Sequence, residues 1–563
     1  MTLLEREPAL EALEGALGEV AHGEGRVALV YGEAGIGKTS LVDCFARARG
    51  QPGRTLWGAC DSLHTPRPLG PVHDIAQQAG SALLGRLEAG APPRVIFSTV
   101  LEELRQHPPV IVVLEDLHWA DAATLDLITF LGRRIRQVPA LLVLTYRDDE
   151  LGPDHPLRIV LGDLATSPAV RRIPLSPLSV AAVRTLAAGR PLDTAALHRQ
   201  TGGNPFFVTE ALASREAGIP ITVRDAVLAR AARLSPAGRT ALDAAAIIGA
   251  QVEPWLLTAL VGDVAAATEE CVALGMLRAQ GDLLGFRHEL ARQAILDTIT
   301  PPRRRALHAL ALRELASPPT GAPDLARLAD HAEGAGDAPA VLAHAPAAAS
   351  RAAALGAHRE AADQYARALR FAASAPPAER ARLLDAYADE WMLVDRLDET
   401  IRARREGLEL HREVRDRPQE GRSLAVLAAA LVRAGRNTEA EEASRRAIAV
   451  LRALPPGAAL AHAYRIQATL RMLNRDRAEA VRWARKTITL AERVGEREIP
   501  SWPATTRWAR PCWSTPTTAG ACTSSAASPW PARRSFPSGS RGPSSTSARP
   551  AARCTASRMR TAT

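Results

Sequence analysis

One short segment near the N-terminus carries the residue types that bind phosphate. It matches the pattern GxxxxGK[ST] at every fixed position, and the predicted nucleotide-binding residues are Gly32, Glu33, Ala34, Gly35, Ile36, Gly37, Lys38, Thr39 and Ser40. Glycines let successive backbone N–H groups turn toward one anion, at the positive end of the helix that follows. A lysine at this spacing reaches the β- and γ-phosphates, and the hydroxyl after it ligates Mg²⁺. We therefore predict that Lys38 contacts the phosphates of ATP and that Thr39 is a ligand of Mg²⁺.

Two adjacent carboxylates follow an apolar run. Residues 110–114 read Val-Ile-Val-Val-Leu and are followed by Glu115 and Asp116. At the carboxyl edge of a parallel sheet, where ligands bind, one carboxylate can hold Mg²⁺ and the other can polarise an attacking water. From position along the strand alone we assign the metal to Glu115 and the base role to Asp116, and the two roles could be exchanged. The alternative is a solvated acidic strand end.

Two further residues are candidates for phosphate contact. Arg147 follows the apolar run 140–145 and would sense the γ-phosphate, unless it is an ordinary surface arginine. His288 ends the segment LGFRH (284–288), which predicts a short hairpin wing. Because a lone histidine is more often packed or solvated than a ligand, its phosphate contact competes with a structural role.

These side chains need a parallel sheet to bring them together. Residues 26–31, 110–114 and 140–145 are short apolar runs that predict buried strands, and helical stretches such as 40–49 lie between them. The alternation predicts an α/β fold of the P-loop NTPase type, with a parallel sheet covered on both faces. A linker is predicted at about 165–178 from its two prolines.

From about residue 340 the chain is repetitive. A glutamate followed by a small residue recurs at spacings of 39, 40 and 40, at Glu360, Glu399, Glu439 and Glu479. Small residues at fixed places let paired helices approach closely, and each pair needs a neighbour to cover its apolar face. The pattern predicts a solenoid of helical pairs. Its period exceeds the roughly 34 residues of the standard tetratricopeptide unit, so we call it tetratricopeptide-like.

Charge and composition argue against a nucleic-acid-binding surface in residues 1–500 and against a secreted or membrane-spanning protein. The 563-residue chain is 47% hydrophobic but only 4% aromatic, which favours helices with alanine- and leucine-rich cores. Residues 1–500 hold 61 basic and 61 acidic residues, so the formal charge of +9 belongs to residues 501–563. The isolated cysteines show no metal-ligand spacing and are typical of a reducing compartment. With no apolar signal segment and no membrane span in the sequence, we expect a cytoplasmic protein.

The tail at 501–563 has an unusual composition. It is rich in Ser, Thr, Arg and Pro, holds Trp and Cys, and contains no Leu, Ile, Val, Asp or Glu. Ordinary disordered tails use Glu, Gln and Lys and avoid Trp and Cys. We therefore predict a frameshift near residues 498–501, with a genuine disordered basic tail as the alternative. A helix-turn-helix is not expected there, because the residues that pack one are missing.

Several segments together resemble one protein family. They are Glu5-Arg6-Glu7, the P-loop, LEDLHWAD (114–121), Thr145-Tyr146-Arg147, GGNPFF (202–207) and FRHEL (286–290). The combination resembles the signal-transduction ATPases with numerous domains (STAND class) found as large ATP-binding regulators of the LuxR family. The resemblance covers about residues 1–500.

The resemblance implies a domain order and further site residues. The domains would be an AAA-like ATPase domain at 1–165, a helical lid at 166–235, a winged helix at 236–300 and tetratricopeptide-like repeats at 301–500, followed by the aberrant tail at 501–563. It also implies that Pro205 contacts the adenine side, that Arg6 and Glu7 lie beside the base, and that His288 senses the β-phosphate.

The implied function is a nucleotide-driven switch and a slow ATPase. ATP, with a small-molecule or protein inducer on the repeats, would favour an open state that associates into a homo-oligomer, and ADP the closed state. DNA would be bound only through a C-terminal module that is missing from this reading frame. Two alternatives stay open: the sensory module of a nucleotide cyclase or kinase, and a non-hydrolysing interaction scaffold. ATP turnover separates them.

Overall fold

A computed structural model describes most of the chain up to residue 495. The described residues are 3–49, 55–63, 65–79, 81–106, 110–188, 192–213, 223–262, 265–286 and 289–495. The predictions for His288 and for the tail at 501–563 lie outside these residues. Within the described ranges, no helix combines the length and the apolar character needed to cross a bilayer.

Five parallel strands form the central sheet. They are β1 (Arg26–Tyr31), β2 (Thr55–Ala59), β3 (Val110–Glu115), β4 (Ala140–Tyr146) and β5 (Val170–Pro174), in the spatial order β2-β3-β4-β1-β5. The three strands that the apolar runs predict are present, and the α/β fold with a parallel sheet is confirmed. The two outermost strands were not predicted.

The interval at 165–178 contains a strand where we expected only a linker. Residues 170–174 pair with β1 along its length. Two adjacent arginines, Arg171 and Arg172, and the terminal Pro174 conceal the strand in the sequence, and they are tolerated because β5 lies at the edge of the sheet. The sheet therefore extends past residue 165, while the domain boundaries themselves stay predictions.

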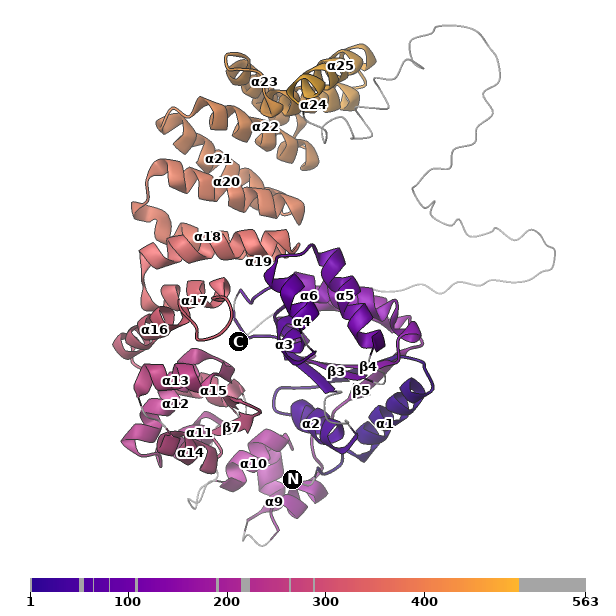
Figure 1. Ribbon diagram of the computed structural model, residues 1–563, viewed down its shortest axis with the longest axis vertical. Helices are drawn as coiled ribbons and strands as arrows, with labels where there is room; N and C mark the ends of the chain where they lie inside the picture. Colours follow the sequence, from indigo (N-terminus) through magenta and orange to yellow (C-terminus); the bar gives the residue numbers. More distant parts are fainter. Residues whose placement is uncertain are drawn as a thin grey trace, which may run out of the picture. The chain divides into compact units, whose positions relative to one another are not determined.

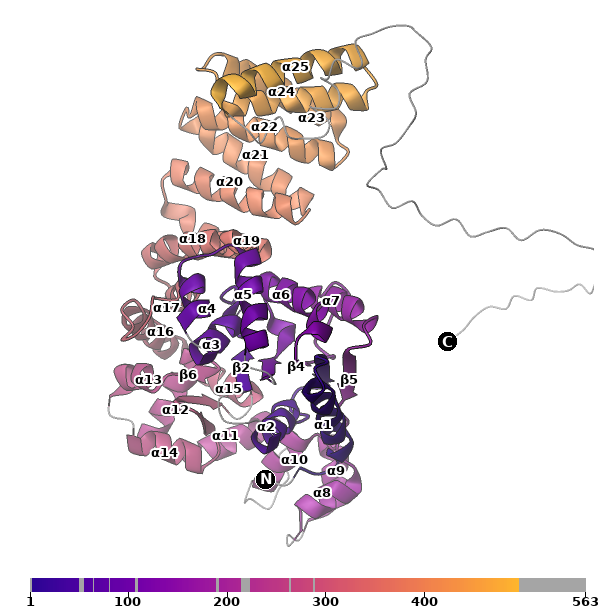
Figure 2. The same ribbon diagram turned by 45° about the vertical axis from the view of Figure 1, so that its right-hand side comes forward.

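Both faces of the sheet are buried, each by its own helices. Successive residues of a strand point to opposite faces, so Val27 and Leu29 join one apolar cluster while Ala28 and Val30 join the other. Figure 2 shows a layer of helices on each face of the sheet, and the two apolar clusters assign each helix to its layer. One layer is α1 (Glu7–Ala21) and α2 (Lys38–Arg49), and the other is α3 (Gly70–Ala79), α4 (Ser81–Glu88), α5 (Pro93–Gln106), α6 (Ala122–Gly132) and α7 (Pro156–Ala165).

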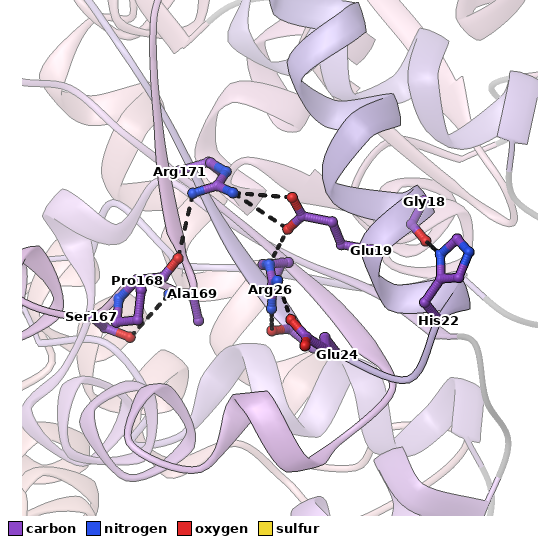
Figure 3. Close-up of polar contacts among 10 residues, drawn as sticks. Gly18, Glu19, His22, Glu24, Arg26, Ser167, Pro168, Ala169 and Arg171 are labelled. Atoms are coloured by element: carbon purple, nitrogen blue, oxygen red, sulfur yellow. Dashed lines mark hydrogen bonds and ion pairs between the residues drawn. The ribbon is translucent and has the colours of Figure 1, made fainter.

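An ion cluster fixes the amino end of β1 (Figure 3). Arg26 pairs with Glu19 near the end of α1 and with Glu24 at 2.5 Å, and Arg171 of β5 reaches Glu19 at 3.0 Å. Because one carboxylate accepts two guanidinium groups, α1 is tied to both strands. The opposite end of β1 leads into the P-loop and stays available for ligand contact.

A set of short helices and a small sheet follow β5. The helices are α8 (Val180–Leu186), α9 (Thr194–Thr201), α10 (Pro205–Ala213), α11 (Val223–Ala231), α12 (Pro236–Ile248), α13 (Pro254–Val261), α14 (Ala265–Ala273) and α15 (Glu289–Leu296). The antiparallel sheet has the order β6-β8-β7, from β6 (Gln251–Val252), β7 (Leu277–Gln280) and β8 (Leu283–Phe286). The β7–β8 hairpin includes residues 284–286 of the segment in which the sequence predicts a hairpin, while a winged helix at 236–300 stays a prediction.

The remaining described chain is a series of antiparallel helical pairs, stacked in order in Figure 1. It comprises α16 (Pro301–Leu315), α17 (Leu325–Ala335), α18 (Ala338–Ala354), α19 (His358–Phe371), α20 (Pro377–Leu393), α21 (Leu397–Glu413), α22 (Arg417–Arg433), α23 (Asn437–Arg452), α24 (Ala458–Leu473) and α25 (Arg477–Val494). The recurring glutamates lie near the starts of α19, α21, α23 and α25, the second helix of each pair. The predicted helical-repeat architecture is confirmed.

Candidate nucleotide-binding site

Three neighbouring strands deliver the candidate residues to one edge of the sheet. β1 leads into the P-loop, β4 lies beside β1, and β3 lies on the other side of β4. Lys38 follows β1, Arg147 follows β4, and Glu115 and Asp116 stand at the end of β3. The strands are parallel, so these residues share the carboxyl edge, where they interact electrostatically.

Three glycines give the P-loop its path. Gly32, Gly35 and Gly37 have φ angles of 147°, 77° and 98°, a region in which side chains are strained. A Cβ on Gly35 would also lie 2.7 Å from the Cβ of Phe206. Glycine is therefore needed here both for the backbone turn and for the contact with the first turn of α10.

The amine of Lys38 is folded back under the loop. Its Nζ donates hydrogen bonds to Gly32 O at 2.6 Å and to Glu33 O at 2.9 Å, and the side chain is buried. Burial lowers the pKa of Lys38 to about 8, and the carboxylate of Asp116 opposes this shift. A buried ammonium gains from a nearby anion, so a bound phosphate would stabilise the charged amine.

The GGNPFF segment (202–207) holds two carbonyls of the P-loop. Asn204 Nδ2 donates to Ala34 O at 2.9 Å, and the N–H of Phe206 donates to Gly35 O at 3.3 Å. Asn204 Oδ1 also accepts from the N–H of Phe206 at 3.1 Å, at the start of α10. These hydrogen bonds fix the backbone of residues 34 and 35 within the P-loop.

Arg6 holds a third carbonyl of the loop. Its Nη2 donates to Ile36 O and to Ser176 O, each at 3.0 Å, and the side chain is buried. Pro205 is the first residue of α10, directly after Asn204. Both residues therefore lie next to the P-loop, while the contacts of Arg6 and Pro205 with a base stay predictions.

Glu115 ends β3 with a buried carboxylate. Its Oε2 accepts a hydrogen bond from Trp57 Nε1 at 2.9 Å, and its Oε1 is buried without a well-formed hydrogen bond to any described residue. Burial, with a smaller contribution from the neighbouring Asp116, raises the pKa of Glu115 to about 7, and the side chain of Thr39 acts in the opposite direction. The hydroxyl of the P-loop and the first candidate carboxylate thus lie together.

Asp116 follows in a left-handed backbone conformation. Its φ is 56°, and its N–H donates to Thr145 Oγ1 of β4 at 3.0 Å. Burial raises the pKa of Asp116, while Arg147 and Lys38 lower it. Such a conformation costs on the order of 1 kcal/mol for a non-glycine residue, and strained positions of this kind gather at functional sites.

Arg147 points inward from the end of β4. Its side chain is only 11% exposed, whereas an ordinary surface arginine would be largely exposed. It pairs with Glu150 at 2.5 Å, and its guanidinium lies 4.8 Å from the ring centre of Trp119 in the short helix η1 (Leu117–Trp119). Beside it, burial lowers the pKa of His118, whose Nε2 is 3.5 Å from Glu150 Oε2.

The arrangement fits a nucleotide phosphate with a divalent cation. The P-loop leads into the N-terminus of α2, where backbone N–H groups and the Lys38 amine can donate to an anion. Glu115 Oε1, which has no well-formed hydrogen bond to a described residue, and the nearby Thr39 hydroxyl are the hard oxygen ligands that Mg²⁺ prefers. Phosphate and metal would therefore satisfy groups that the protein leaves incompletely paired.

Several site residues were not predicted. Asn204 and Thr145 lie within segments that carry the resemblance but were assigned no role, whereas Trp57 has no recognisable spacing signal. His288 lies outside the described residues; next to it, Glu289 at the start of α15 raises the pKa of Asp116, although this contribution is a minor one. The small sheet and α15 therefore lie near the nucleotide edge.

Comparison with known proteins identifies the first part of the chain. Residues 2–144 match the family model of the AAA ATPase domain. This chain contains an AAA-type ATPase domain. Such a domain implies nucleotide binding, usually with a divalent metal ion.

More distant similarities extend over longer stretches. An uncharacterized protein of Rhizobium meliloti (strain 1021) is 26% identical over 372 residues, which cover 54% of this chain, and the chain spans only 36% of that protein's length. A STAND protein with a tetratricopeptide repeat sensor from Pyrococcus horikoshii is 15% identical with a TM-score of 0.45, over 88% of this chain and 84% of that one. A Walker-type ATPase of Pyrococcus abyssi is 14% identical with a TM-score of 0.29, over 52% and 96%.

Proposed function

We propose that the chain is an ATP-binding signal-transduction switch of the class found in large LuxR-type transcriptional regulators. ATP binding and hydrolysis at the P-loop control the conformation of the chain and its association with further copies. The observation that carries the proposal is a contact between the repeats and the ATPase domain, directly after the candidate catalytic carboxylates.

The proposed roles of the site residues follow from their surroundings. Lys38 leaves the carbonyls of the loop and pairs with the β- and γ-phosphates of ATP. Thr39 and Glu115 hold Mg²⁺, which offsets phosphate charge when bound. Asp116 accepts the proton of the attacking water, and Arg147 contacts the γ-phosphate from β4.

Glu360 of the first glutamate-bearing repeat makes the connecting contact. Its Oε1 accepts a hydrogen bond from the N–H of Ala122, at 2.7 Å. Ala122 is the first residue of α6, which follows Asp116 and η1. The side chain thus holds the N-terminus of the helix to which the candidate base loop is joined, so a movement of the repeat would change the position of that loop.

The equivalent glutamates of the next two repeats are used differently. Glu399 pairs with Arg396, and Glu439 pairs with Arg436 at 2.7 Å, each within its own helix start. The residue three positions before Glu360 is Ala357, which offers no charge. The glutamate of the first repeat therefore bonds to the ATPase domain where the next two repeats pair it with an arginine.

A second polar contact lies next to the first. Thr65 Oγ1 accepts hydrogen bonds from Gln364 Nε2 at 2.9 Å and from Arg367 Nη1 at 2.7 Å, both on α19. Arg367 is buried and pairs with Glu333 of α17 at 2.7 Å. The apolar core beneath the sheet also continues into α17–α20. Because the contact is both polar and apolar, rearrangement of the first repeats is coupled to the sheet.

The competing functions differ in their output. A nucleotide cyclase or kinase would need a catalytic segment that the sequence does not show, and a scaffold would need no ATP turnover.

The LuxR-type output is DNA binding, and we propose that a frameshift near residues 498–501 has replaced the reading frame that encodes it. Resequencing the locus tests this: an uninterrupted frame that encodes the same tail contradicts it.

ATP turnover and molecular mass together test the switch. The full chain is incubated with ATP, with ADP or without nucleotide, and phosphate release and mass in solution are measured. We expect slow turnover, absent in Lys38→Ala, and a larger mass with ATP than with ADP. Turnover equal to that of Lys38→Ala supports the scaffold, and a mass indifferent to nucleotide contradicts a switch that controls self-association.

A further inference from the structure

A cavity of about 310 Å³ lies among the last three helices of the repeats, α23, α24 and α25. Each helix contributes residues one turn apart, which share a face at a spacing of four. The polar lining and one aromatic ring are Glu441, Arg445, Gln467, Arg471, Glu479 and Trp483. The volume is at the lower end of ligand pockets and fits a small molecule.

Four of these positions depart from the pattern of the repeat. In the preceding unit, 40 residues earlier, the counterparts of Glu441, Gln467, Arg471 and Trp483 are Ile401, Leu427, Leu431 and Ala443. All four counterparts are buried and apolar. A repeat that only had to stack on its neighbour would keep aliphatic residues here. Local departures from a structural pattern are expected at functional sites. These four residues therefore indicate a functional cavity and not an incidental gap in the packing.

Arg471 contacts two polar side chains that line the cavity. Its guanidinium pairs with Glu441 Oε1 and lies 3.4 Å from Gln467 Oε1. The remaining atoms, Glu441 Oε2 and Gln467 Nε2, are buried and have no hydrogen-bond partner in the described part of the chain. Gln467 is only 2% exposed, so bulk water does not replace the missing partner. One acceptor and one donor on residues that line the cavity are therefore unused.

We infer that this cavity binds a small neutral molecule bearing a carboxamide group. The amide N–H donates to Glu441 Oε2, and the amide carbonyl accepts from Gln467 Nε2, which satisfies both buried atoms. The lining carries two carboxylates, on Glu441 and Glu479, and two guanidinium groups, on Arg445 and Arg471. Because these charges cancel, an uncharged ligand is favoured over an anion or a cation. Trp483 supplies the apolar contact for the rest of the molecule.

Binding of the small molecule does not depend on the proposed function. Only a control of the ATPase by that molecule would rest on it. Binding itself is measured without nucleotide, by ligand-observed NMR on the full chain. The probes are benzamide, methyl benzoate, benzoate and D-glucose, which differ in the amide N–H, in charge and in polyol character. We expect benzamide to bind, and methyl benzoate and benzoate to bind at least about 10-fold more weakly, as for one lost hydrogen bond to a buried group.

Restoring the residue types of the preceding unit gives the decisive variant. Glu441→Ile/Gln467→Leu/Arg471→Leu replaces the buried polar group by aliphatic residues, which is neutral or stabilising in comparable cases, so the repeat should still fold. Benzamide binding should be lost. Gln467→Glu keeps an oxygen for Arg471 but removes the donor, and it should weaken benzamide at least about 10-fold. The exposed neighbour Arg446→Ala should leave binding unchanged.

Three results overturn the inference. They are no binding of benzamide to the unaltered chain, equal binding of methyl benzoate, and unchanged benzamide binding by the triple variant. Binding of D-glucose in place of benzamide also refutes the carboxamide class. ATP binding by each variant is measured in parallel, and it should match the unaltered chain. A failure of ATP turnover with intact benzamide binding would contradict the proposed function and not this site.

Discussion

The nucleotide edge of the sheet and the cavity of the last repeat reveal function in opposite ways. At the nucleotide edge, Lys38 and Thr39 follow a fixed residue pattern, because the backbone that surrounds phosphate requires glycine, lysine and hydroxyl at set positions. In the last repeat, Gln467 and Arg471 are informative because they break the pattern of the preceding unit. A site built from backbone geometry is recognised by agreement with a motif, whereas a site added to a repeat is recognised by departure from one.

The strongest test of the nucleotide edge is Lys38→Ala. The variant loses the amine that is buried beneath the loop, and we expect ATP affinity to fall at least about 100-fold, as for two lost charge-assisted hydrogen bonds. The chain contains only one other lysine, Lys486, which is exposed on α25. Lys486→Ala is therefore the matched control and should bind ATP normally. Equal affinities of the two variants in titration calorimetry would contradict the P-loop assignment.

The carboxylates separate binding from hydrolysis. Asp116→Asn should slow ATP hydrolysis by about 100-fold with little change in ATP affinity, as expected when a general base is lost. Glu115→Gln should first weaken the dependence on Mg²⁺, since its buried oxygen lies beside Thr39. Turnover is measured at saturating ATP over a Mg²⁺ series. The reverse pair of phenotypes would exchange the two roles and preserve the site.

The P-loop, the three central strands and the helical repeats could be predicted because each has a periodic or motif signature. The edge strands could not: β5 carries Arg171 and Arg172, which only an edge position allows. Contacts between distant segments were also hidden. Nothing in the residues around Glu360 shows that its carboxylate caps α6, since the same glutamate in the next two repeats pairs with the arginine three residues before it. Tertiary partners, unlike periodicities, leave no spacing in the sequence.

Asn204→Ala tests the contact between Asn204 and the P-loop. Asn204 lies in the GGNPFF segment (202–207), but its sequence context predicted no role for it. The variant removes the donor to Ala34 O and the acceptor for the N–H of Phe206. We expect a loss of about 1–2 kcal/mol in stability and a loss of up to about 10-fold in ATP affinity. Asn204→Asp keeps the acceptor but lacks the donor, so it should recover stability more than affinity. Urea unfolding and calorimetry distinguish the two contributions, and unchanged values in Asn204→Ala would contradict the contact.

The smallest expected effect concerns Glu360 and the pH. Burial, with smaller contributions from the nearby carboxylates of Asp121 and Asp363, raises the pKa of Glu360 to about 7, although the N–H of Ala122 opposes the shift. A carboxyl with a raised pKa in the folded state binds its proton more tightly there than in the unfolded chain. The stability that it contributes is therefore greatest below pH 4.5 and declines as the pH rises to about 7.

Glu360→Gln removes this titration but keeps an oxygen for the N–H of Ala122. The variant should melt at about the same temperature as the unaltered chain near pH 4.5, and the variant's advantage should grow to about 1–2 kcal/mol by pH 8, a value reduced for partial access of water. Glu439→Gln is the matched control at the same repeat position, where hydrogen bonding to Arg436 lowers the pKa of the carboxyl. Its sign should be opposite, with stability lost relative to the unaltered chain as the pH rises above the range in which Glu439 ionises. If both variants respond alike to pH, the first repeat does not use its glutamate differently from the others, and the proposed coupling through α6 loses its basis.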